Sequence, residues 1–260
     1  MKFEREYTTR TCEINTHGYL KPTQLFQYLQ ETAEHQLKYI GRDYTYMYNV
    51  ERKAFLLSRM GVEIYEPVYR YADITVRTWV IEGRAANFPR AYEMYSGDKL
   101  IAKSYSNWAL VDVDTRKLIR SKDYDYSEYP HDEIPEMVLP SRVRIPSDLE
   151  LKAYGTARVG YNLSDINGHM NNTQYLNILA DEIPGVEDYD FTSINIRYIN
   201  EAPLGSEMEI TGTDIVWKTD NPGLAAETDP AADGVIFFRT TDGGVINVEA
   251  AFGIKKVEQL

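Results

Sequence analysis

The octapeptide DINGHMNN, residues 165–172, brings an acid, a histidine and three asparagines together directly ahead of an apolar run. A carboxylate four residues before a histidine suits a functional site, because both side chains can move protons. The chain has only four histidines, and His17, His35 and His131 do not occur in such a cluster. We therefore take Asp165 and His169 as candidate catalytic residues and expect structural or solvated roles for the other histidines.

The position of this cluster predicts further chemistry. The apolar run after it indicates a short helix from about Asn171 to before Pro184, whose first backbone N–H groups would stabilise an oxyanion. Either Asn171 or Asn172 would cap that helix, which is the structural alternative for the asparagine pair. A second acid, Glu201, follows the next apolar segment in RYINEAP (197–203) and is either a catalytic carboxylate or a solvated strand end.

The rest of the chain predicts two similar halves. In the first, we expect a strand at 3–14, a helix from Pro22 to Ile40 ended by Gly41, and strands at 53–65, 73–83, 89–96 and 99–113. SGDK at 96–99 is typical of a hairpin turn. After a Pro-rich acidic segment at 121–150, the order recurs with strands at 152–162, 190–200, 206–217, 234–240 and 244–256, and an irregular loop at 219–234.

A direct alignment of the halves supports an internal repeat. HGYLKPTQLFQYLQ (17–30) falls over NGHMNNTQYLNILA (167–180) without a gap, and both segments share glycine, threonine and glutamine positions. Past the helix, Glu66–Pro67 pairs with Ala202–Pro203, which places Glu201 opposite Tyr65. Only the second copy carries the acids and the histidine, since its Asp165 and His169 fall over Asn15 and Tyr19.

One long helix and four alternating strands per copy predict an α+β fold, a tandem (double) hotdog in which an antiparallel sheet wraps each helix. The expected organisation is an N-terminal hotdog at 1–120, a linker at 121–150 and a C-terminal hotdog at 151–260 carrying the catalytic residues. Its start, MKFEREYTTR, does not resemble a secretory signal, no apolar run is long enough to cross a bilayer, and Cys12 is the only cysteine. A cytoplasmic protein without disulfides or a cysteine-based metal site is therefore expected.

Composition and motifs also exclude several functions. A net charge of −12 argues against nucleic-acid binding, which requires a basic surface. The sequence contains no G-x-S-x-G elbow, H-E-x-x-H motif, P-loop or dinucleotide fingerprint. Carboxylate-assisted chemistry remains, and we expect neither a cofactor nor a metal.

The run DINGHMNNTQYLN (165–177), followed by YINEA (198–202), resembles the signature of the fatty acyl-acyl carrier protein thioesterases. These are double-hotdog enzymes of plants and bacteria that release free fatty acids. SYSNWALVDVDTRKLIR (104–120) is similar to the family's strand with a tryptophan followed by a T-R turn. The resemblance spans nearly the whole chain, although related acyl-CoA thioesterases share parts of the motif.

The resemblance implies that the catalytic residues are Asp165, Asn167, His169 and Glu201. Asp165 or Glu201 would activate water or attack the thioester directly, His169 would orient or transfer protons, and Asn167 would stabilise the oxyanion. The residue after the glutamate is often cysteine in the plant enzymes and is Ala202 here, so a thiol mechanism is not expected at this position.

The implied reaction is hydrolysis of fatty acyl-acyl carrier protein to free fatty acid and holo-acyl carrier protein, by a monomer or homodimer that binds neither nucleic acid nor membrane. An acyl-CoA thioesterase and a noncatalytic acyl-binding hotdog are the alternatives. The first copy would hold the acyl chain, and its Tyr28, Phe55 and Trp79 either select the chain or fill the core. Basic side chains that would meet an acidic carrier protein are Arg142, Arg144, Arg158 and Lys218.

Overall fold

The computed structural model describes residues 2–257 of the 260-residue chain, which divides into two compact units. The first unit comprises Met1–Met60 and Tyr65–Met137, and the second Gly61–Ile64 and Val138–Leu260. Within residues 2–257, no helix combines the length and apolar character needed to cross a membrane.

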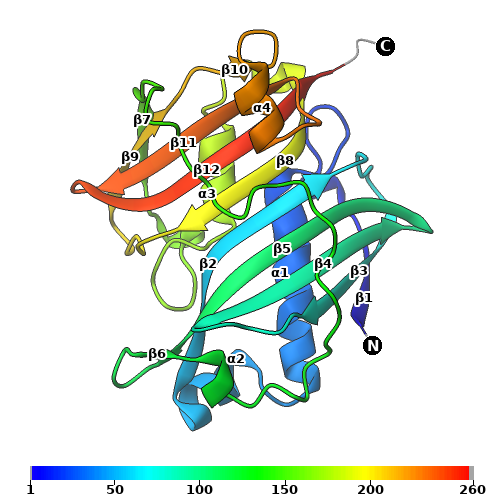
Figure 1. Cartoon of the computed structure of the whole chain (residues 1–260), viewed down its shortest axis with the longest axis vertical. Helices are drawn as coiled ribbons and strands as arrows, with labels where there is room; N and C mark the ends of the chain where they lie inside the picture. The colour runs from blue at the N-terminus through cyan, green and yellow to red at the C-terminus, as the bar shows by residue number, and fades with distance from the viewer. Residues whose placement is uncertain (1, 258–260) are drawn as a thin grey trace. The chain divides into compact units, whose positions relative to one another are not determined.

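The first unit follows the predicted order of a strand, a long helix and further strands (Figure 1). Its strands are β1 (Phe3–Thr8), β2 (Lys53–Ile64), β3 (Asp73–Val80), β4 (Asn87–Ser96), β5 (Lys99–Asp112) and β6 (Leu118–Ile119), and its helices are α1 (Pro22–Tyr39) and α2 (Tyr44–Tyr46). The strands are hydrogen-bonded in the order β1-β3-β4-β5-β2, with β6 beside β5. The β4–β5 hairpin closes at the predicted turn, where Ser96 pairs with Lys99 and Gly97 has a φ of +57°.

Helix α1 begins and ends as its sequence predicts. Pro22 occupies its first turn, where a missing N–H costs nothing. One apolar face is buried along its length: Leu25, Phe26, Leu29, Ala33 and Leu37. At its end, Gly41 adopts a φ of +72° and the Arg42 N–H donates to the Leu37 carbonyl at 2.8 Å, a bond that satisfies an otherwise unpaired helix carbonyl.

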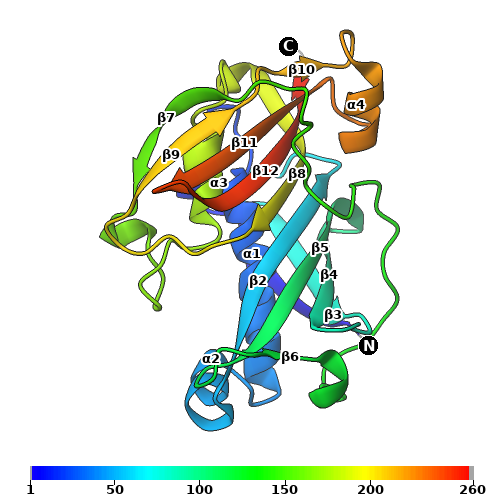
Figure 2. The same cartoon turned by 60° about the vertical axis from the view of Figure 1, so that its left-hand side comes forward.

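The second unit repeats this plan with a shorter helix. Its strands are β7 (Lys152–Arg158), β8 (Tyr189–Tyr198), β9 (Glu207–Gly212), β10 (Val216–Trp217), β11 (Gly234–Asp242) and β12 (Val245–Lys256), and its helices are α3 (Gln174–Ala180) and α4 (Pro222–Thr228). The strand order β7-β9-β11-β12-β8 is the order of the first unit with each strand replaced by its repeat equivalent. In Figures 1 and 2, α1 and α3 each lie along one face of their own unit's sheet. The double hotdog predicted from the repeat is confirmed.

Several predicted boundaries differ. The first strand ends at Thr8, and a 3₁₀ turn (Thr11–Glu13) follows it. Helix α3 begins at Gln174 rather than near Asn171, because the chain first makes a turn fixed by the Asn171 side chain. The segment 219–234 is not wholly irregular, since α4 forms there with Asn221 as its cap, its side chain accepting from the Leu224 N–H at 3.1 Å.

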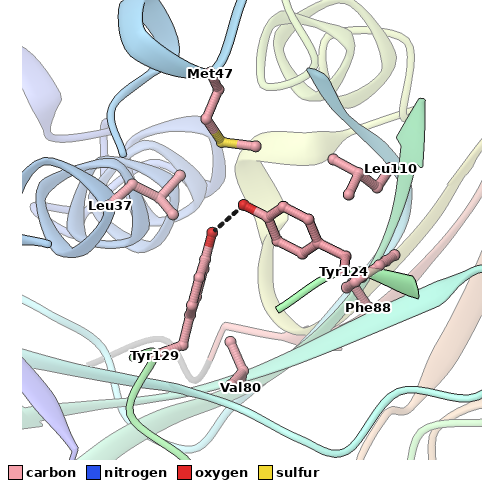
Figure 3. Packing of buried hydrophobic residues seen from close by; sticks show 7 residues of the cluster. All are labelled: Leu37, Met47, Val80, Phe88, Leu110, Tyr124 and Tyr129. Atoms are coloured by element: carbon pink, nitrogen blue, oxygen red, sulfur yellow. Dashed lines mark hydrogen bonds between the residues drawn. The ribbon is translucent and has the colours of Figure 1, made fainter. Parts of the chain in front are cut away.

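The acidic segment at 121–150 is packed against both units rather than extended alone. Tyr124 and Tyr129 join a buried cluster of the first unit, where their hydroxyls lie 3.2 Å apart (Figure 3). Val143 is buried in a cluster of the second unit, and Ile145 and Leu149 pack against that cluster. Apolar and aromatic residues spaced through a polar segment thus anchor it to each unit in turn.

Candidate active site

The loop that carries the predicted catalytic residues is folded around the Asp165 side chain. Its Oδ1 accepts hydrogen bonds from the backbone N–H groups of Asn167 at 2.8 Å and His169 at 3.2 Å. The Asp165 N–H in turn donates to the His169 carbonyl at 2.8 Å. Gly168, with a φ of +75°, lets the chain reverse within this loop. Asp165 therefore fixes the backbone from which His169 projects.

A short main-chain ladder joins this loop to the turn that carries Glu201. The Met170 N–H donates to the Ala202 carbonyl, and the Leu204 N–H donates to the Gly168 carbonyl, both at 2.8 Å. The ladder brings the His169 Nε2 to 3.5 Å from the Glu201 Oε2. The His169 side chain is 31% exposed and that of Glu201 is 59% exposed, so water and a substrate have access to the pair. Two residues more than thirty positions apart thus form one acid–base pair.

The four predicted side chains make two direct contacts with one another, one within the loop and one between the loop and the Glu201 turn. The Asn167 Nδ2 donates to the Asp165 Oδ2 at 3.4 Å, within the loop itself. His169 and Glu201 form the second pair. The carboxylate in contact with the histidine ring is therefore that of Glu201.

Backbone N–H groups at the start of α3 are turned toward acceptors within the chain. The Asn171 N–H donates to the Leu163 carbonyl, and the Gln174 N–H donates to the Asn171 carbonyl. The Asn171 Oδ1 accepts from both the N–H and the hydroxyl of Thr173, at 2.9 and 2.8 Å. An oxyanion site at the start of α3 stays a prediction. The capping role expected for Asn171 or Asn172 is wrong, because Thr173 precedes the helix without a side-chain cap bond and Asn171 bonds within the turn before it.

The first unit contains the same loop without its chemistry. There the Asn15 Oδ1 accepts from the N–H groups of His17 at 3.0 Å and Tyr19 at 2.9 Å. The ladder also recurs, because the Leu20 N–H donates to the Val68 carbonyl at 2.7 Å. The fold thus requires an acceptor at the position of Asp165, but not a charged one.

This ladder corrects the alignment of the two copies beyond the helix. Ala202 is the structural equivalent of Val68, since each accepts the same hydrogen bond. Glu201 therefore corresponds to Pro67 and not to Tyr65. The conclusion drawn from the alignment is unchanged, because the first copy has no carboxylate at that position either.

Two further residues lie close to Glu201 and were not predicted. Asn247 of β12 is buried, and its Nδ2 donates to the Glu201 carbonyl at 3.4 Å. Tyr175 of α3 is also buried, and its burial, together with the nearby Glu201 carboxylate, raises the pKa of its hydroxyl. Neither was identifiable from sequence, because Tyr175 fits an ordinary apolar helix face and Asn247 belongs to a distant strand.

The first unit contains an apolar cavity of about 70 Å³. Its walls come from α1, from the segment after α2 and from strands β2 to β5, and include Leu37, Met47, Phe55, Phe88 and Trp108. Of the three residues considered for acyl binding, Phe55 lines this cavity. Tyr28 instead donates to Glu13 at 2.6 Å, and the Trp79 indole donates to the Glu133 carbonyl at 2.8 Å.

The second unit contains a hollow of about 300 Å³ beside α4. The exposed Arg142 and Arg144 both line it, so two of the four predicted basic residues lie together. The Lys218 ammonium donates to the Pro230 carbonyl at 3.0 Å. Across residues 2–257, no three His, Cys, Asp or Glu side chains are grouped so as to hold a metal ion.

Comparison with protein families gives two matches. Residues 1–129 match the acyl-ACP thioesterase N-terminal domain, and residues 151–235 match the acyl-ACP thioesterase C-terminal domain. Together these matches cover more than half of the chain. No curated protein sequence matches it.

Solved structures share the fold at low sequence identity. An acyl-ACP thioesterase from Bacteroides thetaiotaomicron is 20% identical with a TM-score of 0.81, and 97% of each chain is covered. An oleoyl thioesterase (putative) from Lactobacillus plantarum is 15% identical with a TM-score of 0.81, covering 100% of this chain and 98% of its own. A 12:0-ACP thioesterase from Umbellularia californica is 15% identical with a TM-score of 0.78, covering 98% of each. At these identities the comparison establishes the fold alone.

Proposed function

Because this chain belongs to the acyl-ACP thioesterase family, and is therefore an enzyme that hydrolyses fatty acyl-ACP thioesters to free fatty acid and holo-acyl carrier protein, we propose that His169 and Glu201 carry out its chemistry. The observation behind this proposal is the 3.5 Å separation between the His169 Nε2 and the Glu201 Oε2. An imidazole beside a carboxylate can take a proton from water, because the carboxylate stabilises the positive charge that develops on the ring.

The proposed reaction has one nucleophilic attack and two proton transfers. A water molecule at the His169–Glu201 pair loses a proton to it while its oxygen attacks the thioester carbonyl carbon. The C–S bond then breaks, the acyl group leaves as a fatty acid, and the pair returns the proton to the departing thiolate of the phosphopantetheine arm. The exposed Asn167 amide would donate to the oxyanion. Asp165 holds the loop that carries Asn167 and His169.

The first unit has a different proposed duty. Its cavity has a mainly apolar and aromatic wall, which suits an aliphatic chain, and the equivalent loop carries no acid–histidine pair. We assign the acyl chain to this cavity, with Phe55 among the residues that set its accepted length. A cytoplasmic location and a monomer or homodimer remain predictions.

Release of free fatty acid from acyl-ACP by Glu201→Gln and His169→Asn tests the assignment. Each variant should lower kcat about 100-fold or more, since general acid–base catalysis contributes roughly 10²–10⁴-fold. The exposed Glu207 of β9 provides the matched control, because Glu207→Gln makes the same chemical change outside the His169–Glu201 pair and should retain wild-type kcat. Wild-type kcat in Glu201→Gln would contradict the proposal and leave Asp165 as the candidate catalytic carboxylate.

A further inference from the structure

Asn247 fixes the turn that carries Glu201. Its carbonyl accepts from the N–H groups of Ile199 at 2.8 Å and Asn200 at 3.2 Å, at the point where β8 ends. Its side-chain Nδ2 reaches one residue further and donates to the Glu201 carbonyl at 3.4 Å. Three consecutive residues of the turn are thus bonded to one residue of β12. The side-chain bond is the one that depends on residue type.

The Asn247 side chain carries a folding penalty. It is 2% exposed, and its Oδ1 is buried without a hydrogen-bond partner among the described residues. Exchanging the two amide atoms would not help, because Oδ1 would then face the Glu201 carbonyl and Nδ2 would be unpaired. A buried unpaired polar atom is unfavourable, and an apolar side chain of similar shape would avoid that penalty.

A neighbouring asparagine shows the ordinary arrangement. Asn195 of β8 is also 2% exposed, and its Nδ2 donates to the Pro140 carbonyl at 3.0 Å. Its side-chain atoms are not among the buried unpaired ones. The two asparagines thus share burial and bond type, but only Asn247 lies against the turn of Glu201 and carries an unpaired oxygen.

We infer that Asn247 is a positioning residue that holds the Glu201 carboxylate against His169. The inference rests on the proposed function of Glu201 and extends the site to β12. A carboxylate on an exposed turn gains from such a restraint, because a displacement of about 1 Å at a reacting group can cost as much as 10²-fold in rate. The unpaired oxygen is then the folding penalty that accompanies the restraint.

Steady-state hydrolysis and thermal unfolding of Asn247→Ala and Asn247→Leu test this inference. We expect kcat to fall about tenfold or more with KM within twofold, while Tm is unchanged or higher, because the unpaired oxygen is removed. The leucine variant fills the volume if the alanine variant folds poorly. Asn195→Ala is the matched control, with a lower Tm and wild-type kcat at saturating substrate expected; its KM is not compared, because Asn195 lines the hollow that contains Arg142 and Arg144.

A double-mutant comparison separates this inference from the proposed function. In a Glu201→Gln background, Asn247→Ala should cause little further loss of kcat, because the carboxylate that it positions is gone. The inference is overturned if both Asn247 variants keep wild-type kcat, or if Asn247→Ala lowers kcat by the same factor in both backgrounds. Wild-type kcat in Glu201→Gln alone would instead overturn the proposed function.

Discussion

Asn15 and Asp165 occupy the same position in two copies of one loop, and each accepts hydrogen bonds from the backbone N–H groups two and four residues later. The neutral amide of Asn15 and the carboxylate of Asp165 thus have the same structural role, which is to accept the backbone hydrogen bonds of the loop. What Asp165 adds is negative charge beside the site. This relationship separates the structural role of the residue from any chemical one.

Replacing Asp165 by Asn and by Ala should therefore give different results. Asp165→Asn retains the acceptor seen at Asn15, so its Tm should stay near that of the wild-type protein while kcat falls at least tenfold. Asp165→Ala removes the acceptor of two N–H groups and should also lower stability, by about 1–3 kcal/mol. Thermal unfolding together with fatty-acid release measures both effects. Wild-type kcat in Asp165→Asn would mean that the charge has no part in the reaction.

The cavity of the first unit gives a prediction about chain length. Phe55→Ala enlarges the cavity, so the preference among acyl-ACP substrates should move toward longer chains, by about one to three carbon pairs. Trp79 provides the control, since it is 1% exposed but does not line the cavity. Trp79→Phe should lower Tm and leave the preference unchanged. An unaltered length profile in Phe55→Ala would place the acyl chain elsewhere.

Arg142 and Arg144 give a prediction about the carrier protein. The chain carries a net charge of −12, so an acidic carrier requires a local basic surface, and these two exposed side chains share one hollow. Arg142→Glu with Arg144→Glu should raise KM for acyl-ACP about tenfold at low salt, with less effect on acyl-CoA of the same chain length. Lys122→Glu, at an exposed position of the first unit, is the charge control. Equal effects on both substrates would argue against carrier contact at this surface.

Glu13 gives a prediction about acid stability. Its carboxylate accepts from the Tyr28 hydroxyl at 2.6 Å and from Arg10, and the side chain is almost fully buried. Burial raises the pKa of Glu13, but the hydrogen bonds from Arg10 and Tyr28 outweigh it, so the net pKa lies below the ordinary value of 4.5.

A depressed carboxyl pKa contributes stability above the unfolded-state pKa and loses it as pH falls through the folded-state value. Glu13→Gln should therefore have a lower Tm than the wild-type protein at pH 7. This difference in Tm should become smaller as pH falls below about 4.5. Glu82→Gln, at an exposed position, should have the same Tm as the wild-type protein across this pH range. Thermal unfolding from pH 3 to pH 7 provides the measurement. A Tm difference that stays constant over this range would show that the charge of Glu13 does not cause the loss of stability in Glu13→Gln.

The sequence by itself determined the architecture. Period-two and helical patterns are local, and they recur in the same order in both halves, so the strands, α1 and the repeat were predictable from residues such as Leu25, Leu29 and Gly41. Asp165 and His169 were also apparent, because a polar cluster before an apolar helix is a local signal, whereas Glu201 was suggested by its place after a strand and by the family resemblance. Element boundaries that depend on a single side-chain hydrogen bond, such as the start of α3 after Asn171, were not predictable from the sequence.

Only the tertiary structure decided which of these residues meet. The contact between His169 and Glu201 depends on the main-chain ladder between two distant loops, and this ladder also corrected the equivalent of Glu201 from Tyr65 to Pro67. Asn247 reaches the site from the far end of the chain, a proximity that strand pairing creates and no sequence spacing encodes. Local patterns specify elements, whereas the partners of a side chain depend on how those elements are hydrogen-bonded and packed.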